Sequence, residues 1–327
     1  MSDLTATAVA CANIAFIKYW GNRDHALRLP ANPSLSMNLD GLTARTTVEF
    51  NERFQADSFI LNDASTTSKG EKRVHLFLEE IRRLAKSNLF AHVESVNTFP
   101  TGVGIASSAA AFAALALAGS AALGLNLTEA ELSRLARRGS GSACRSVPGG
   151  FVEWQMGAGD LDSYAFSIAP ADHWDLRDCI AVISAQHKTT GSTEGHALAN
   201  TSPLQAARVQ DADRRMELCR SAILQRDFTA LASVVEQDST IMHAVMMTSQ
   251  PPLYYWQSAT LGVMLAVQEW RRSGMPVCFT IDAGPNVHVL CESAVQSAVT
   301  SRLQELPGVQ RVITARPGPA AHLISAK

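Results

Sequence analysis

The sequence lacks any large excess of charge of one sign. Its 28 lysine and arginine residues are balanced by 30 aspartate and glutamate residues, which leaves a formal net charge of −2 at pH 7. A protein that binds nucleic acid or an anionic membrane surface by electrostatic attraction carries a basic excess or a basic cluster. We therefore expect no nucleic acid and no membrane among the partners of this protein.

Cysteine is scarce and scattered. The 327 residues include six cysteines, and no two of them form a C-x-x-C pair. This spacing argues against a disulfide framework and against a zinc site, and it suits reduced, buried thiols. No apolar run reaches the length of a membrane span, and the first eight residues lack the basic and apolar regions of a signal peptide. From these absences we expect a cytoplasmic protein.

The sequence does contain enough apolar residues, 46% of the total, to build a large core in one or two domains. Alternating apolar residues predict strands, among them a pair over 32–39 and 44–50. Apolar residues at three- and four-residue spacing predict helices over 70–87, 202–225, 228–246 and 252–272. This mixture predicts an α/β protein.

Residues 98–118 consist of a glycine-rich turn followed by an alanine-rich segment, and a strand-like segment precedes them. Such a turn before a helix points backbone N–H groups at an anion. The string is neither a Walker A loop nor a dinucleotide fingerprint, so a tight turn before a well-packed helix remains the alternative. The residues suited to phosphate contact are Pro100, Gly102, Gly104, Ser107 and Ser108.

Three charged residues stand in unusual surroundings, and each has two interpretations. Lys18 lies in an apolar strand, either as a cation over a ligand or as an edge residue reaching water. Arg145 lies in a loop of glycine and serine, either as a bidentate anion clamp or as a surface residue. Asp282 follows a strand and precedes Ala-Gly-Pro-Asn, either as a catalytic base or as a turn former.

Four strings of the sequence are distinctive: N-I-A-F-I-K-Y-W-G-N-R-D (13–24), F-P-T-G-V-G-I-A-S-S-A-A (99–110), G-S-G-S-A-C-R-S (139–146) and F-T-I-D-A-G-P-N (279–286). They occur in the order seen in mevalonate diphosphate decarboxylases, and the sequence resembles that family over essentially its whole length. The resemblance implies an α/β (α+β) fold of the two-lobed GHMP-kinase type with the active site in the cleft. The N-terminal ATP-binding lobe, with the Gly-rich phosphate loop, would cover 1–185, and the C-terminal α/β lobe would cover 186–327.

The resemblance also implies a reaction, the ATP-dependent decarboxylation of a 5-phosphorylated mevalonate in isoprenoid biosynthesis. The C3 hydroxyl is phosphorylated, and phosphate and CO2 are then lost. By the same resemblance Asp282 acts on the C3 hydroxyl, Arg145 grips the substrate carboxylate and Lys18 lies near the reacting centre. Substrate contacts are expected from Asn13, Tyr19, Asn22, Ser140, Ser142 and Arg145. ATP contacts are expected from Pro100, Gly102, Gly104, Ser107, Ser108 and Ser192. Mg²⁺ is assumed to come with ATP, and no metal site of the protein's own is predicted.

The sequence departs from the family at two positions. The family string usually reads K-Y-W-G-K-R-D, and its second lysine touches the distal phosphate of the substrate; here that residue is Asn22. Some members have an arginine where this sequence has Thr193. The missing cation favours mevalonate 5-phosphate as substrate and isopentenyl phosphate as product. The alternative is the 5-diphosphate giving isopentenyl diphosphate, with Arg23 or Arg28 supplying the charge.

Two other classes of function stay open at the level of sequence. One is a small-molecule kinase of the same fold that stops at the phosphorylated product, and the other is a ligand sensor without catalysis. Retention of Lys18, Arg145 and Asp282 together argues against a sensor, since a sensor needs no base. The expected partner is a small-molecule substrate, with a homodimer as an open option.

Overall fold

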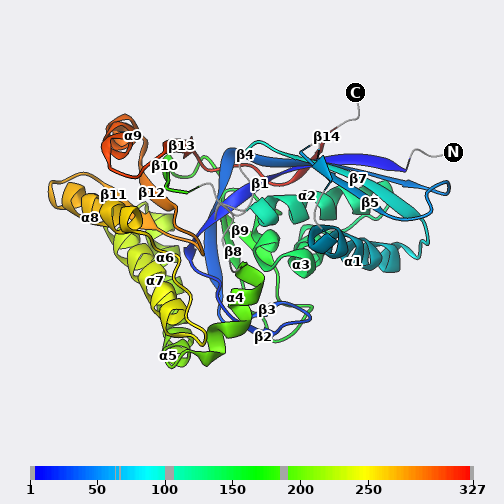
Figure 1. Cartoon of the computed structure of the whole chain (residues 1–327), viewed down its shortest axis with the longest axis horizontal. Coiled ribbons are helices and arrows are strands. Elements are labelled where there is room, and N and C mark those ends of the chain that lie inside the picture. Colours follow the sequence, from blue (N-terminus) through cyan, green and yellow to red (C-terminus); the bar gives the residue numbers. More distant parts are fainter. Residues whose placement is uncertain (1–3, 63, 66–67, 100–106, 185–190, 325–327) are drawn as a thin grey trace.

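We describe the fold from a computed structural model, which describes residues 4–62, 64–65, 68–99, 107–184 and 191–324. Pro100, Gly102 and Gly104, predicted to contact ATP, lie outside these residues. Figure 1 shows two lobes, with helices α1 to α3 in one and helices α5 to α9 in the other.

The first lobe is built on an eight-stranded sheet. Its main path has the strand order β14-β1-β4-β7-β5-β6, with β8 paired to β4 and β9 paired to β8. The pairs are antiparallel except β5 with β7. The strands are β1 (Thr5–Ile17), β4 (Ser34–Asn51), β5 (Ser58–Leu61), β6 (Ala64–Ser65), β7 (Phe90–Asn97), β8 (Phe151–Trp154), β9 (Ala165–Ala169) and β14 (His322–Ile324). The small hairpin of β2 (Asn22–Asp24) and β3 (Leu29–Pro30) follows β1.

Helix α2 (Ser107–Ala122) packs on β1 and β4, and 11 of its 16 residues are buried. Small alanine side chains allow this close approach between helix and sheet. Helices α1 (Ser68–Ala85) and α3 (Glu129–Gly139) pack beside α2, and the short helix η1 (Gly141–Ser146) follows α3. Among the described residues, no helix combines the length and the apolar character needed to cross a membrane.

The strands predicted over 32–39 and 44–50 form one continuous strand, β4, rather than a pair. Strand β1 pairs with β4 from Leu35 to Glu49. Along this pair the register jumps, because Cys11 lies opposite Thr43 while the next residue, Ala12, lies opposite Leu39. Gly41 in this bulge has a φ of +84°, a conformation that favours glycine. Asp40 and Gly41, between the two predicted strands, therefore lie in a bulge within one strand.

The second lobe has a four-stranded antiparallel sheet in the order β11-β12-β10-β13. Its strands are β10 (Leu176–Val182), β11 (Val277–Thr280), β12 (Val287–Glu292) and β13 (Arg311–Ala315). Its helices are α4 (Ser192–Leu198), η2 (Ala199–Thr201), α5 (Gln205–Gln210), α6 (Ala212–Gln225), α7 (Phe228–Thr248), α8 (Ser258–Arg272), η3 (Ser293–Val295) and α9 (Gln296–Glu305). The helix predicted over 202–225 is thus divided at Asp211.

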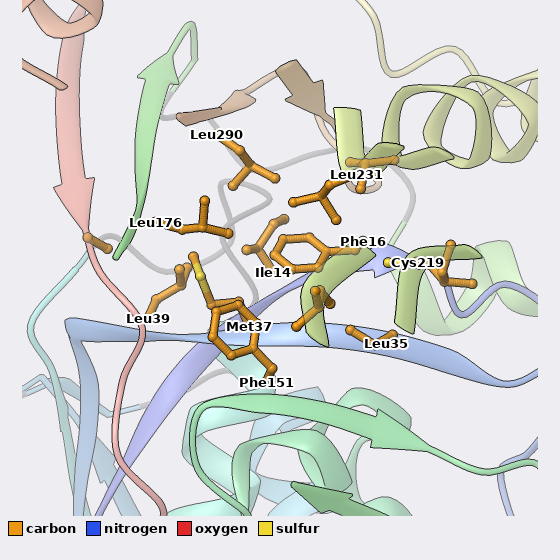
Figure 2. Close-up of a cluster of buried hydrophobic side chains, with 14 of the residues drawn as sticks. Ile14, Phe16, Leu35, Met37, Leu39, Phe151, Leu176, Cys219, Leu231 and Leu290 are labelled. Carbon is orange, nitrogen blue, oxygen red and sulfur yellow. The ribbon is translucent and has the colours of Figure 1, made fainter. Parts of the chain in front are cut away.

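The two lobes share a hydrophobic core. Figure 2 shows Ile14 and Leu35, from the first sheet, facing Leu176, Leu231 and Leu290 from the second lobe. Strand β10 belongs to the second sheet although it precedes residue 185, and β14 returns the chain to the first sheet. The chain therefore passes from one sheet to the other both before residue 185 and again near its C-terminal end. The division into lobes at 185/186 stays a prediction.

Candidate active site

A cleft of about 560 Å³ is lined by residues of both lobes. The residues predicted from sequence that line it are Lys18, Tyr19, Ser107, Ser108, Ser140, Ser142, Arg145, Ser192 and Asp282. They come from the end of β1, the start of α2, the segment around η1, the start of α4 and the turn after β11. The fold thus brings together residues that lie up to 264 positions apart in the chain.

Lys18 and Asp282 form an ion pair on the cleft wall. The Nζ of Lys18 lies 2.6 Å from Oδ1 of Asp282, and the side chains are 1% and 27% exposed. Burial by itself raises the pKa of Asp282, but the charges of Lys18, His288 and Arg145 hold that pKa below its usual value. Burial lowers the pKa of Lys18, and Asp282 opposes this shift. An anionic carboxylate partly open to the cleft is suited to accept a proton.

The backbone of Lys18 is held by residues of the second lobe. Its N–H donates to Oδ1 of Asp238 at 2.7 Å, and its carbonyl accepts from Nη2 of Arg208 at 2.6 Å. The other carboxylate oxygen of Asp238 accepts from Nε of Arg215 at 2.8 Å, and all three side chains are buried. This network is not among the features predicted from the sequence. Asp238 shares the apolar face of α7 with Leu231, Val235 and Met242, and a charge at that spacing was an available signal.

Arg145 is buried, which rules out the surface-loop interpretation. Its Nη1 donates to Oγ of Ser34 at 2.7 Å, and its Nη2 donates to Oδ1 of Asn13 at 3.1 Å. The Nε–H is buried and has no hydrogen-bond partner among the described residues. Asn13 also donates to Oγ of Ser146 at 2.8 Å. The guanidinium is therefore fixed in orientation by two of its five N–H donors, and the other three have no partner among the described residues.

Asn13 and Asn22, predicted to contact substrate, are not among the residues that line the cleft. Asn13 lies behind Arg145 and orients it. Asn22 is buried, and its amide oxygen accepts a hydrogen bond from the hydroxyl of Tyr19. Tyr19 itself lines the cleft and packs so closely on Gly141 that a Cβ there would lie 2.5 Å from the ring. In this geometry Asn13 and Asn22 support the cleft wall rather than form its surface.

Serine hydroxyls and backbone N–H groups occur where phosphate binding is predicted. Ser107 and Ser108 are the first residues of α2, and Ser192 is the first residue of α4. The hydroxyl oxygens of Ser108 and Ser140 lie 3.2 Å apart. The first N–H groups of a helix lack partners within the helix, so the start of α2 offers donors to an anion.

Three cationic residues on the cleft wall are absent from the predicted site: Arg28, Lys72 and Arg73. The sequence suggests Arg28 only as an alternative source of charge for the diphosphate. Lys72 and Arg73 belong to the charged face of α1, which the sequence suggests is solvated. Arg73 instead lies over the ring of Phe112, at 5.0 Å from its centroid. The sequence alone does not distinguish an arginine that stacks on Phe112 of the neighbouring helix from an arginine on the surface.

A smaller apolar cavity of about 160 Å³ adjoins the cleft. It shares Arg73, Ser107 and Ser108 with the cleft, and Phe59 and Leu115 are among its apolar lining residues. No group of three or more potential metal-ligating His, Cys, Asp or Glu side chains occurs in the part of the chain that the structure describes.

Two family models match the chain, one in each half. The model described as diphosphomevalonate decarboxylase-like N-terminal domain matches residues 10–165. The model described as mevalonate 5-diphosphate decarboxylase C-terminal domain matches residues 179–317. Together they include every described residue predicted for the site.

Curated proteins and solved structures are similar over nearly the same length. The diphosphomevalonate decarboxylase of Homo sapiens is 41% identical over 311 residues, covering 87% of this chain and 77% of that protein. The enzyme of the same name from Candida albicans is 39% identical over 317 residues, covering 91% and 87%.

The mevalonate diphosphate decarboxylase structure from Staphylococcus aureus has a TM-score of 0.93 at 37% identity and covers 98% of each chain. A complex described as MDDEF with MVAPP, AMPPCP and magnesium has a TM-score of 0.93 at 39% identity, covering 98% and 99%. These similarities confirm the predicted two-lobed α/β fold.

Proposed function

Because the chain belongs to the diphosphomevalonate decarboxylase family of the GHMP superfamily, we propose that it converts mevalonate 5-diphosphate to isopentenyl diphosphate with ATP. It is an ATP-dependent carboxy-lyase of the mevalonate pathway. The observation that carries the proposal is the Lys18–Asp282 ion pair in a cleft that also contains the buried Arg145.

The diphosphate replaces mevalonate 5-phosphate, which the sequence favours, as the proposed substrate. The relatives and structural neighbours are named for the diphosphate, and MVAPP is the ligand of one of them. The sequence favours mevalonate 5-phosphate because Asn22, in place of lysine, would leave the distal phosphate of the diphosphate without a cation. Asn22 does not line the cleft, whereas Arg28 does, so the neutral residue at position 22 is a poor measure of the charge facing the substrate.

Asp282 would act on the C3 hydroxyl of the substrate. Its carboxylate is anionic and partly exposed to the cleft, so it can accept the hydroxyl hydrogen bond and then the proton as the oxygen is phosphorylated. Lys18 keeps this carboxylate ionised and fixed at 2.6 Å. The buried contacts to the Lys18 backbone would keep the pair in place without help from the substrate.

Arg145 would hold the substrate carboxylate during the second step. As the C3–O bond breaks, its electron pair leaves with phosphate, and the electron pair of the C1–C2 bond forms the C2=C3 double bond as CO2 departs. A guanidinium fixed by Ser34 and Asn13 keeps the carboxylate in one orientation until the bond breaks.

The residues of the cleft fit a nucleotide with magnesium. Ser107, Ser108 and Ser192 would contact its phosphates, and the adjoining apolar cavity suits the base. Asp282 and Glu194 are the carboxylates among the described residues of the cleft, so Mg²⁺ would be held mainly by phosphate oxygens. When bound, the ion neutralises charge on the transferred phosphoryl group.

A paired assay tests this proposal. CO2, ADP and inorganic phosphate are measured with ATP and either mevalonate 5-diphosphate or mevalonate 5-phosphate. We expect the three products in equal amounts and a higher kcat/KM for the diphosphate. ADP without CO2 would indicate a kinase instead, and preference for the monophosphate would contradict the proposed substrate. A homodimer and a cytoplasmic location stay predictions.

A further inference from the structure

Arg28 lies on the cleft wall beside Tyr19, on the short hairpin that follows Lys18. Its Nε–H donates to the carbonyl of Arg138 at 3.0 Å, which ties the hairpin to α3. Within the described residues, the other N–H groups of Arg28 have no hydrogen-bond partner, and no carboxylate lies within salt-bridge distance. The guanidinium is thus anchored at one edge, and four donors are left for a ligand.

The charges near Arg28 are cations rather than acids. Arg138 lies close enough to add to the effect of burial in lowering the pKa of Arg28. Burial and the charge of Arg28 lower the pKa of Arg73 to about 10. The Nε–H of Arg73 is buried and has no partner among the described residues. Arg138 is paired with Glu80 at 3.3 Å and with Asp160 at 3.9 Å, whereas no carboxylate among the described residues pairs with Arg28 or Arg73. Two guanidinium groups without a carboxylate of their own are electrostatically costly until an anion with several oxygens binds to them.

The two cations on the cleft wall lie beside different parts of the site. Arg73 lines the apolar cavity together with Ser107 and Ser108, on the side proposed for the nucleotide. Arg28 lines the cleft but not that cavity. It adjoins Tyr19, which packs on Gly141 in the segment that also presents Arg145. This position places Arg28 on the side of the cleft proposed for the substrate.

We propose that Arg28 binds the distal phosphate of the substrate and sets the preference for the 5-diphosphate over the 5-phosphate. This inference rests on the proposed function. The hydroxyl of Tyr19 donates to Asn22, so position 22 is used to orient the tyrosine, and position 28 supplies the charge. A monophosphate ends before the distal group and makes no contact with Arg28, which is why this residue discriminates between the two substrates.

The variant Arg28→Gln tests the proposal through the ratio of two kcat/KM values. Loss of a charge-assisted hydrogen bond lowers affinity about 10- to 100-fold. We expect that loss for mevalonate 5-diphosphate, little change for mevalonate 5-phosphate and an unchanged KM for ATP. Arg28→Lys keeps a point charge and should recover part of the preference.

Arg23→Gln is the matched control. Arg23 lies on the same hairpin but is exposed, and its Nη2 donates to the carbonyls of Met156 at 2.9 Å and Gly157 at 2.5 Å. The Arg23→Gln variant should leave the ratio of the two kcat/KM values, diphosphate to monophosphate, at its wild-type value. Thermal unfolding of each variant separates a loss of binding from a loss of the contact between Arg28 and Arg138.

Binding of inorganic pyrophosphate, measured by calorimetry, gives a readout that does not need turnover. Arg28→Gln should weaken pyrophosphate binding about 10-fold or more relative to wild type. Equal losses with both substrates, an increased KM for ATP or unchanged pyrophosphate binding would overturn the role of Arg28. A wild-type protein that releases no CO2 from either substrate, yet binds pyrophosphate through Arg28, would overturn the proposed function and leave the anion site standing.

Discussion

At the scale of single residues, the site depends on charges that are buried and held from several sides. Lys18, Arg145 and Asp282 were each ambiguous in the sequence, where a snorkelling lysine, a surface arginine and a turn aspartate were equally ordinary. The structure buries Lys18 and Arg145 and pairs Lys18 with Asp282. Sequence alone could supply the residue types but not the pairing, because 264 positions separate Lys18 from Asp282.

The variant Arg145→Lys tests the need for a planar clamp. Lysine cannot reproduce the two Nη contacts to Ser34 and Asn13, nor the planar, forked donor geometry of a guanidinium. We expect kcat/KM for mevalonate 5-diphosphate to fall about 10- to 100-fold, as for a lost hydrogen bond to a charged group. Steady-state CO2 release measures this, and wild-type activity in the lysine variant would remove Arg145 from the substrate site.

At the scale of elements, helices and strands are predictable where the periodic pattern is long, and their interruptions are not. The pattern over 70–87 matches α1, and the capping box at Thr128 and Glu131 begins α3 as its sequence indicates. The bulge at Gly41 looks like a hairpin turn because both use a glycine with positive φ. Only the pairing of β4 with β1 along its full length separates these two outcomes.

Asp57 ties α1 to the first sheet. Its carboxylate accepts from Nη1 and Nη2 of Arg82 at 2.8 and 3.0 Å and from the N–H of Ala91 at 2.9 Å. Burial alone raises the pKa of Asp57, but the bonds from Arg82, Ala91 and His75 outweigh it and bring the pKa below the usual 3.8. The carboxylate therefore stabilises the folded state above pH 3.8, and this contribution is lost as the pH falls through the lower folded-state pKa.

The variant Asp57→Asn should lower the free energy of unfolding at pH 7 by about 1.5–3 kcal/mol, the range for hydrogen bonds to a charged group. The difference from wild type should shrink as the pH falls through the pKa of Asp57. Urea denaturation over a pH series measures this. Glu269→Gln, which removes an exposed pair with Arg272, is the control and should have little effect at any pH. A difference that persists unchanged into acid would show that the charge of Asp57 is not the cause.

At the scale of the whole molecule, the second lobe holds Lys18, the proposed catalytic lysine, which the first lobe supplies. Asp238 and Arg208 contact the Lys18 backbone on either side of the residue, and the core joins the two lobes nearby. This junction could not be predicted from the sequence, because buried arginines in α5 and α6 have the same local pattern as solvated ones. The two-lobed arrangement itself was predictable only through family resemblance.

The variant Asp238→Asn should weaken both stability and catalysis. It leaves the buried guanidinium of Arg215 without its buried carboxylate, and breaking such a pair costs about 3–5 kcal/mol. Asp211→Asn is the matched control, because Asp211 also binds Arg215, at 2.6 Å, but is 38% exposed. Denaturant unfolding should show a clearly larger loss for Asp238→Asn. Equal losses in the two variants would argue against a buried junction at Lys18.

We propose that Asp282, ionised beside Lys18, handles the proton of the C3 hydroxyl. The most direct test is the kcat for CO2 release from mevalonate 5-diphosphate by the Asp282→Asn variant, with substrate binding measured in parallel. We predict a loss of about 100-fold or more in kcat, as for removal of a positioned acid–base group, with little change in substrate affinity. Near-wild-type turnover in this variant would contradict the claim.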